Sequence, residues 1–371
     1  MKTLLIFLSL FISAACFSQN LFLFVGTYTA GNESKGIYVY RFNASTGAAE
    51  WVSNTDSIVN PSYLTLSPDH RYVYSVTESG GAWPGSVSAF SFNQSSGQLS
   101  FINKQLSGGD NPCYITTDKS GKWVVVGNYT GGNLAALPIN KNGSLQPYTQ
   151  LIQHTGTGVN KERQEKAHVH STVFSADGNY LFTPDLGMDK VFIYKFNGSA
   201  KKPLTPAAQP FVKSDGGNGP RHFIFHPNKK FAYLIEEMSG TVAAYKYNNG
   251  KLTFLQRLST HPKDYKGDIG SADIHLSPDG KFLYASNRGN ANSIAIFSVQ
   301  PNGKLVWIDS QSTMGLTPRN FVIDPTGNFL LAANQKSNNI AIFRRNAKTG
   351  LLRYTGKSIE VPSPVCLQII K

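Results

Sequence analysis

Residues 277–287 read Ser277-Pro278-Asp279-Gly280-Lys281-Phe282-Leu283-Tyr284-Ala285-Ser286-Asn287, a tight turn followed by a mostly apolar strand. Turns of this kind, each between two short apolar runs, begin at Ser67, Asp118, Ser175, His226, Ser277 and Asp324. Successive turns are separated by 51, 57, 51, 51 and 47 residues. A repeat of this length built from short strands is typical of a propeller, with one four-stranded blade per repeat.

The other half of the repeat is a strand that occurs seven times, beginning at Ile37, Val87, Leu134, Val191, Val242, Ile294 and Ile340. The seventh hairpin is divided between the two ends of the chain. Residues 363–369 match the first strand of the hairpin, and residues 21–27 match the second. We therefore predict an all-β, seven-bladed β-propeller in one domain, residues 20–371. Its ring is closed by pairing of the C-terminal and N-terminal strands, which leaves only short, protected sheet edges.

The first residues of the chain have the pattern of a secretory signal peptide. Met1-Lys2-Thr3 is followed by an apolar run from Leu4 to Ile12 and by the small residues Ser13-Ala14-Ala15. We predict a signal peptide over residues 1–19 and an exported protein, periplasmic or extracellular. The apolar run is too short to span a membrane, so no transmembrane segment is expected. Cys16 raises the alternative of a lipid anchor, against which Ser13 stands where a larger aliphatic residue is usual.

Charge and cysteine content narrow the range of partners. The chain has 35 Lys and Arg against 22 Asp and Glu, a net charge of +13. Its lysines are scattered over turns rather than gathered in a patch, which argues against nucleic acid and is compatible with an anionic small substrate. Cys113 and Cys366 fall in first strands of different blades and are expected to be buried thiols rather than a disulfide. No Cys/His spacing indicates zinc, and we expect no cofactor and a monomer or weak dimer.

One end of the ring is expected to carry the chemistry. The residues just before each first strand and just after each second strand emerge on the same face. Before the first strands come Ser62, Tyr114, His168, His170, Arg221, His222, Asp273 and Arg319. After the second strands come Glu78, Asn128, Asp185, Glu236, Glu237, Asn287, Arg288 and Asn334. The hairpin tips at the opposite end are plain turn residues.

Each of these candidates also has a structural interpretation. His168 and His170 lie on the same side of a strand and are catalytic, metal-binding or simply hydrogen-bonded, although no third metal ligand recurs nearby. Arg221 and Arg288 are alternatively salt-bridge partners between blades. Glu237 is alternatively the counter-charge of a neighbouring arginine. Glu236 alternates to the other side of the strand and is expected to be structural.

The chain resembles the bacterial 6-phosphogluconolactonase family of seven-bladed lactonases, which includes fungal carboxy-cis,cis-muconate cyclising enzymes. The resemblance is carried by residues 24–29, 167–171, 219–222 and 286–289, which contain Phe-Val-Gly-Thr, His-x-His, Gly-Pro-Arg-His and Asn-Arg-Gly. It implies a His, an Arg, a Glu and a further Arg in the channel mouth. We accordingly predict the catalytic residues His168, His170, Arg221 and Glu237. The predicted substrate-binding residues are Arg288, Arg319, Asn128, Glu78 and Asp185.

These residue types suit hydrolysis of a lactone by general acid–base catalysis. Ring opening needs a base to activate water, a cation near the oxyanion and an acid for the leaving alkoxide. No Gly-x-Ser-x-Gly elbow is present, so no acyl-enzyme is expected. We predict hydrolysis of a sugar lactone, with an ionisation of histidine between pH 5 and 8. The alternatives are a muconate-type lactonising cycloisomerase and a non-catalytic binding or scaffold propeller. Because the leader predicts export, the natural lactone is expected to differ from the cytosolic sugar-phosphate lactone.

Overall fold

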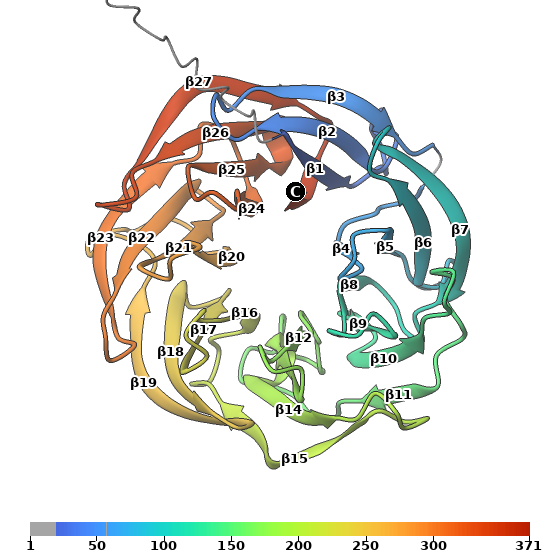
Figure 1. Cartoon of the computed structure of the whole chain (residues 1–371). Coiled ribbons are helices and arrows are strands. Elements are labelled where there is room, and N and C mark those ends of the chain that lie inside the picture. The colour runs from blue at the N-terminus through green and yellow to red at the C-terminus, as the bar shows by residue number, and fades with distance from the viewer. Residues whose placement is uncertain (1–19, 57) are drawn as a thin grey trace, which may run out of the picture.

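A computed structural model describes residues 20–56 and 58–371, and it shows seven four-stranded antiparallel sheets arranged as a ring (Figure 1). The predicted signal peptide and Cys16 lie outside the described residues. From the innermost strand outward, the closing sheet is β28 (Pro364–Ile370), β1 (Asn20–Thr27), β2 (Tyr38–Asn43) and β3 (Ala49–Asn54). The next two sheets are β4 (Leu64–Leu66), β5 (Tyr72–Thr77), β6 (Ser86–Asn93), β7 (Gln98–Leu106), and β8 (Pro112–Thr117), β9 (Trp123–Asn128), β10 (Asn133–Pro138), β11 (Gln150–Gln153).

The remaining four sheets repeat the same order. They are β12 (Val173–Phe174), β13 (Tyr180–Asp185), β14 (Lys190–Phe196), β15 (Leu204–Lys213); β16 (Pro220–Phe225), β17 (Phe231–Glu236), β18 (Thr241–Asn248), β19 (Lys251–Ser259); β20 (Ser271–Leu276), β21 (Phe282–Asn287), β22 (Ser293–Val299), β23 (Leu305–Ser312); and β24 (Pro318–Ile323), β25 (Phe329–Asn334), β26 (Asn339–Arg345), β27 (Leu352–Glu360). Two short 3₁₀ helices follow second strands, η1 (Leu186–Met188) and η2 (Gln335–Ser337).

The closing sheet confirms the predicted architecture. Strand β28 pairs with β1 in antiparallel register, from Phe22 opposite Ile370 to Thr27 opposite Pro364. In Figure 1 the red C-terminal strand accordingly lies against the blue N-terminal one. The hydrophobic core lies between neighbouring sheets, where for example Phe24, Phe90 and Val126 belong to one buried cluster.

The chain enters the inner strands through a repeated backbone device. The residue before the recurring proline has a positive φ in five blades: Asn60 (41°), Asn111 (52°), Gly219 (67°), Thr317 (61°) and Ser363 (44°). This left-handed conformation reverses the chain, and the following proline then fixes φ without requiring a hydrogen-bond partner for a backbone N–H. The device agrees with the interpretation of the prolines as fixing the angle at which each inner strand begins, so the side chains that follow reach the same end of the ring.

The opposite end of the ring is formed by hairpin turns, each stabilised by hydrogen bonds within the turn. The Ser277 hydroxyl donates to the Asp279 carboxylate at 2.6 Å, and Gly280 adopts a φ of +71° and donates its N–H to the Ser277 carbonyl at 2.8 Å. Equivalent Ser–Asp contacts occur in the turns at Ser67 and Ser175. Within residues 20–56 and 58–371, no helix combines the length and the apolar character needed to cross a membrane.

Candidate active site

Polar side chains converge on a cavity of about 250 Å³ at the end of the ring where the inner strands begin. The cavity is lined by Tyr28, Glu78, Cys113, Tyr129, Arg163, His170, Glu237, Arg288 and Arg319. Five of the nine predicted site residues are in this lining, namely Glu78, His170, Glu237, Arg288 and Arg319. The other four lie behind the lining or elsewhere.

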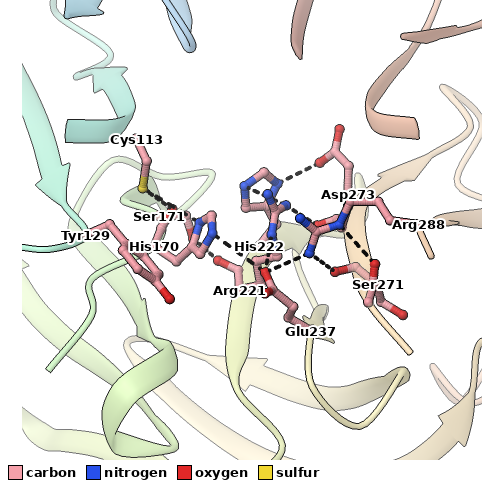
Figure 2. Close-up of polar contacts among 12 residues, drawn as sticks. Cys113, Tyr129, His170, Ser171, Arg221, His222, Glu237, Ser271, Asp273 and Arg288 are labelled. Atoms are coloured by element: carbon pink, nitrogen blue, oxygen red, sulfur yellow. Dashed lines mark hydrogen bonds and ion pairs between the residues drawn. The ribbon is translucent and has the colours of Figure 1, made fainter. Parts of the chain in front are cut away.

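Glu237 is the centre of a cluster of guanidinium groups (Figure 2). Arg163 Nη2 donates to its Oε1 at 2.8 Å, while Arg221 Nε donates to Oε2 at 2.9 Å and Arg288 Nη2 lies 3.0 Å from the same oxygen. Burial would raise the pKa of the Glu237 carboxyl, but Arg288 and Arg221 outweigh it and hold that pKa well below its usual range. The carboxylate therefore stays ionised, and three cations share one negative charge.

His170 faces the cavity beside this cluster (Figure 2). The isolated bridge between Val169 and Asp185 and the hydrogen bond from the His170 N–H to the Pro184 carbonyl fix its backbone. Its Nε2 is 3.8 Å from Glu237 Oε2, and its Nδ1 is 3.7 Å from the Cys113 sulfur. Burial and the nearby Arg221 lower the pKa of His170 well below 6.5. The imidazole is therefore neutral near pH 7.

His168 has a different environment from His170. Its ring stacks on Tyr129 with centroids 4.4 Å apart, its Nδ1 is 3.0 Å from the Tyr129 carbonyl oxygen, and its Nε2 is 3.2 Å from Glu165 Oε2. His168 does not line the cavity, whereas Tyr129 does. The structure therefore divides the His-x-His pair: His170 reaches the cavity and His168 supports its wall.

Arg221 lies beneath the cavity rather than in its lining, and only 1% of it is exposed. Besides binding Glu237, its Nη1 contacts His222 Nε2 at 3.2 Å and the Ala272 carbonyl oxygen. Burial and Arg288 lower the pKa of Arg221 to about 10, which still leaves it charged near neutral pH. Arg221, predicted to be catalytic, therefore contacts Glu237 from beneath the cavity and does not reach its lining.

A buried His–Asp pair holds Arg221 in turn (Figure 2). His222 Nδ1 is 2.7 Å from Asp273 Oδ1, and Asp273 Oδ2 also lies 3.0 Å from His275 Nε2. A guanidinium can only donate, so His222 Nε2 is the acceptor and Nδ1 carries the proton. Burial and Arg221 lower the pKa of His222 to about 4, which keeps that tautomer neutral.

The opposite wall of the cavity contains an arginine without an anionic partner. The Arg319 guanidinium lies over the Tyr28 ring, 5.5 Å from its centroid. The Tyr28 hydroxyl donates to both Glu78 carboxylate oxygens at 2.9 Å, and Ser62 also donates to that carboxylate. Arg319 makes no hydrogen bond or ion pair with any residue that the structure describes, so its donors are available to a ligand in the cavity.

Two predicted substrate-binding residues are held away from the cavity. Asn128 Nδ2 donates to the Ser107 carbonyl at 2.9 Å, and Asp185 binds His154 Nδ1 at 2.7 Å and the His168 N–H at 2.8 Å. Both are fully buried and neither lines the cavity. Asn287 and Asn334 make the same kind of contact, to the carbonyls of Thr260 and Thr313. This position at the end of the second strand ties the sheet to the connection that follows the outer strand of the preceding sheet.

Sequence reasoning missed Arg163, Tyr28, Tyr129 and Cys113. Arg163 lies between β11 and β12, in the connection that lengthens one repeat spacing to 57 residues, so the irregular spacing was its signal. Tyr28 follows β1, which is the second strand of the divided sheet, and therefore occupies the same position as Glu78 after β5. Cys113 and Cys366 are both free and buried, as expected. No three His, Cys, Asp or Glu side chains in the described part of the chain are grouped so that they could hold a metal ion.

Comparisons with known proteins agree with this architecture. Residues 22–369 match the family described as "Lactonase, 7-bladed beta-propeller". A 6-phosphogluconolactonase of Formosa agariphila is 44% identical over 349 residues, covering 94% of this chain and 99% of the relative, and one of Bacillus subtilis is 36% identical over 350 residues, covering 94% and 97%. A periplasmic gluconolactonase of Pseudomonas aeruginosa superimposes with a TM-score of 0.90 at 38% identity, covering 95% of this chain and 99% of that one. The chain belongs to the seven-bladed β-propeller lactonase family.

Proposed function

We propose that this protein hydrolyses a sugar lactone, with His170 as the general base and then the general acid. The observation that carries the proposal is a neutral imidazole in the cavity, 3.8 Å from a carboxylate that is itself held by three arginines. The names of the 44% and 36% identical relatives support the reaction type. They also favour an enzyme over a scaffold propeller.

The reaction follows from the positions of the charges. His170 removes a proton from water as the water oxygen adds to the lactone carbonyl carbon, and Glu237 stabilises the imidazolium that forms. The carbonyl oxygen becomes an oxyanion, for which Arg319 on the opposite wall supplies a cation with free donors. When the intermediate collapses, the bond between the carbonyl carbon and the ring oxygen breaks. The imidazolium returns its proton to that oxygen, which leaves an open-chain hydroxy acid.

Glu237 is a poor alternative base in this arrangement. Both of its oxygens accept from guanidinium groups, and its pKa is held well below the usual range. The pKa of His170 is lowered as well, so the two groups differ in their contacts: guanidinium donors occupy both Glu237 oxygens, whereas His170 Nε2 has no hydrogen bond to the described residues and lies in the cavity, 3.8 Å from Glu237 Oε2. The role of Glu237 in the proposal is to orient Arg163 and Arg288 and to stabilise protonated His170.

The proposal is tested by replacing each of the two histidines with asparagine. We expect His170→Asn to lower kcat for glucono-δ-lactone by about 10²–10⁴-fold with little change in KM, the usual contribution of general acid–base catalysis. His168→Asn is the matched control, because it makes the same change on a side chain outside the cavity. The assay follows acid release with a pH indicator, and thermal melting verifies the fold. If His170→Asn retains near wild-type turnover on glucono-δ-lactone and on the other lactones that the wild type opens, His170 is not the base.

We also propose that the protein is exported, on the pattern of residues 1–15 and on its similarity to a periplasmic relative. Mass spectrometry of protein recovered from the periplasm or medium is expected to give an N-terminus between residues 15 and 20. Full-length protein in the cytoplasm would contradict export. A chain that begins at Cys16 with added lipid mass, lost in Cys16→Ser, would replace cleavage to a free protein with a lipid anchor.

A further inference from the structure

A thiol forms part of the cavity wall beside His170. Cys113 follows the proline that opens β8, and the register between β8 and β9 shifts at this residue, so Cys113 is left unpaired in a bulge. Bulges of this kind direct one side chain out of the regular alternation of a strand. The same bulge carries Arg221 and Arg319 in two other blades. In this blade it places the Cys113 sulfur in the lining of the cavity.

The Cys113 sulfur has three polar neighbours, all from the segment that leads into β12. It lies 3.5 Å from the His170 carbonyl oxygen, 3.7 Å from the Val169 carbonyl oxygen and 3.7 Å from His170 Nδ1. Burial raises the pKa of the Cys113 thiol, so the sulfur keeps its proton near pH 7. A neutral thiol has one proton to donate, and its sulfur is also a weak acceptor. The thiol can therefore donate to only one of these neighbours at a time.

The two carbonyl groups determine where the thiol proton is needed. In the described part of the chain, the Val169 and His170 carbonyl oxygens accept no hydrogen bond from a donor other than this thiol. A carbonyl oxygen can only accept, and leaving it buried without any donor is costly, whereas a ring nitrogen that carries its own proton needs an acceptor instead. With the S–H group donating to a carbonyl, the sulfur presents a lone pair to His170 Nδ1. The Nδ1–H group then donates to the sulfur.

The other ring nitrogen of His170 has no comparable acceptor. Nε2 makes no hydrogen bond within residues 20–56 and 58–371, and the Glu237 Oε2 atom beside it is 3.8 Å away and already accepts from Arg221 Nε. A proton on Nε2 would therefore lack a partner at hydrogen-bond distance. Because a neutral imidazole carries one proton, the contacts favour that proton on Nδ1 and a lone pair on Nε2.

We infer that the Cys113 thiol fixes the tautomer of His170 and thereby makes Nε2 the nitrogen that acts as the base. Cys113 is a positioning residue, because it acts through His170. The inference rests on the proposed function, in which His170 is the base, and adds to it the residue that selects the reacting nitrogen. The contact also persists through the reaction, because Nδ1–H remains a donor to the sulfur when Nε2 takes up a proton.

The tautomer is measured directly by NMR. In protein labelled with ¹⁵N-histidine, protonated and unprotonated ring nitrogens have different chemical shifts, and the His170 signals are identified by their loss in His170→Asn. At pH 7 we expect the proton of wild-type His170 on Nδ1. Cys113→Ala should change the ratio of the two tautomers in favour of Nε2–H by about two- to tenfold, which corresponds to one neutral hydrogen bond. Cys113→Ser should change it less, because a hydroxyl can both donate and accept.

Kinetics of the same variants measure the consequence for the reaction. In Cys113→Ala, kcat for glucono-δ-lactone should fall in proportion to the loss of the Nδ1–H tautomer, by up to about tenfold, while KM changes little. Cys113→Ser should restore part of kcat. Cys366→Ala is the matched control, because it removes the other buried thiol, whose sulfur accepts from the Leu64 N–H in the neighbouring sheet. This control should leave both kcat and the His170 tautomer unchanged.

The role of Cys113 and the proposed function fail in different ways. A proton on Nε2 in wild type, or the same tautomer ratio in wild type and Cys113→Ala, would overturn the role of Cys113 even if the protein opens lactones. If wild type opens no lactone, the proposed function fails, and the NMR comparison still decides whether Cys113 fixes the tautomer. Thermal melting verifies the fold of each variant. Should Cys113→Ala not fold, Cys113→Val removes the same donor and acceptor while filling the space.

Discussion

One nitrogen of His222 determines how Arg221 is held, and Arg221 in turn holds Glu237. Asp273 accepts the proton of His222 Nδ1, so Nε2 presents a lone pair to the guanidinium. If His222 were protonated, two N–H groups would face each other at 3.2 Å. The low pKa of His222 keeps Nε2 unprotonated, and this allows Nε2 to accept a hydrogen bond from Arg221.

This buried histidine predicts a loss of stability in acid. The pKa of His222 is about 4 in the folded protein, against 6.5 for an exposed histidine. Above pH 6.5 neither state is protonated, so the stabilisation is complete. As the pH falls from 6.5 towards 4, only the unfolded chain takes up the proton, and the free energy of unfolding drops by up to about 3 kcal/mol. Urea unfolding at pH 7.5, 5.5 and 4.5 is expected to show this drop.

The contribution of His222 is isolated by variants. His170 acts in the same direction, so His222→Gln should reduce the drop without abolishing it. His70→Gln, in a hairpin turn, changes the histidine content equally and serves as control. Identical pH slopes for His222→Gln and wild type would show that the burial of His222 has no such effect.

Arg221 and Arg319 are predicted to respond differently to the same substitution. Arg221→Gln removes one partner of a buried ion pair, which usually destabilises a protein by about 3–5 kcal/mol. Arg319→Gln removes a cation without an anionic partner in the described residues, so we expect little loss of stability. Its turnover should instead fall by about 10²–10³-fold, as for loss of an oxyanion donor. Thermal melting and lactone assays of both variants check this contrast, and equal destabilisation would contradict it.

At the scale of single elements, the sequence repeat predicted the strands and turns that every blade shares. It did not predict features found in one blade alone. Turn spacing predicted the strands, the divided sheet and the face on which His170, Glu237 and Arg319 gather. It did not separate Asn128 from Glu78, although Asn128 is the last residue of β9 and Glu78 is the first residue after β5, the position that Tyr129 occupies after β9. Successive side chains along a strand point to opposite sides, so Asn128 turns away from the cavity, while Glu78 and Tyr129 line it. Arg163 lies in the connection between β11 and β12 and has no counterpart in the repeat.

The hydrogen bond from Asn128 to the Ser107 carbonyl predicts a structural role for the last residue of a second strand. Asn128→Ala should lower the free energy of unfolding by about 1–3 kcal/mol, because a buried backbone carbonyl loses its partner. KM and kcat should stay near wild type, since Asn128 does not line the cavity. Glu78→Gln, one residue beyond the end of β5 and in the cavity lining, is the comparison variant. A raised KM in Asn128→Ala without destabilisation would support the substrate-binding role predicted from the sequence.

At the scale of the whole molecule, every blade contributes to one small cavity. Around the ring the lining residues are Tyr28, Glu78, Cys113 with Tyr129, His170 with Arg163, Glu237, Arg288 and Arg319. Tyr28, which follows β1 in the closing sheet, lies beneath the guanidinium of Arg319 from β24 in the neighbouring sheet, with 5.5 Å from the ring centroid to the guanidinium carbon. The cavity therefore has its full geometry only when the ring is closed.

Closure by β28 gives the last prediction. Deletion of residues 362–371 removes the inner strand of the closing sheet and leaves β1 with an unpaired edge in the ring. We expect loss of soluble folded protein.

The matched control is a circular permutant in which residue 371 is joined to residue 20 by about four Gly/Ser residues and the chain is opened at the turn between β8 and β9. Because Phe22 pairs with Ile370 and this turn is at the end opposite the cavity, the permutant should stay monomeric and active. Size-exclusion chromatography, thermal melting and a lactone assay compare the two chains. A truncated protein that remains monomeric with an unchanged melting curve would show that the ring does not depend on its C-terminal strand.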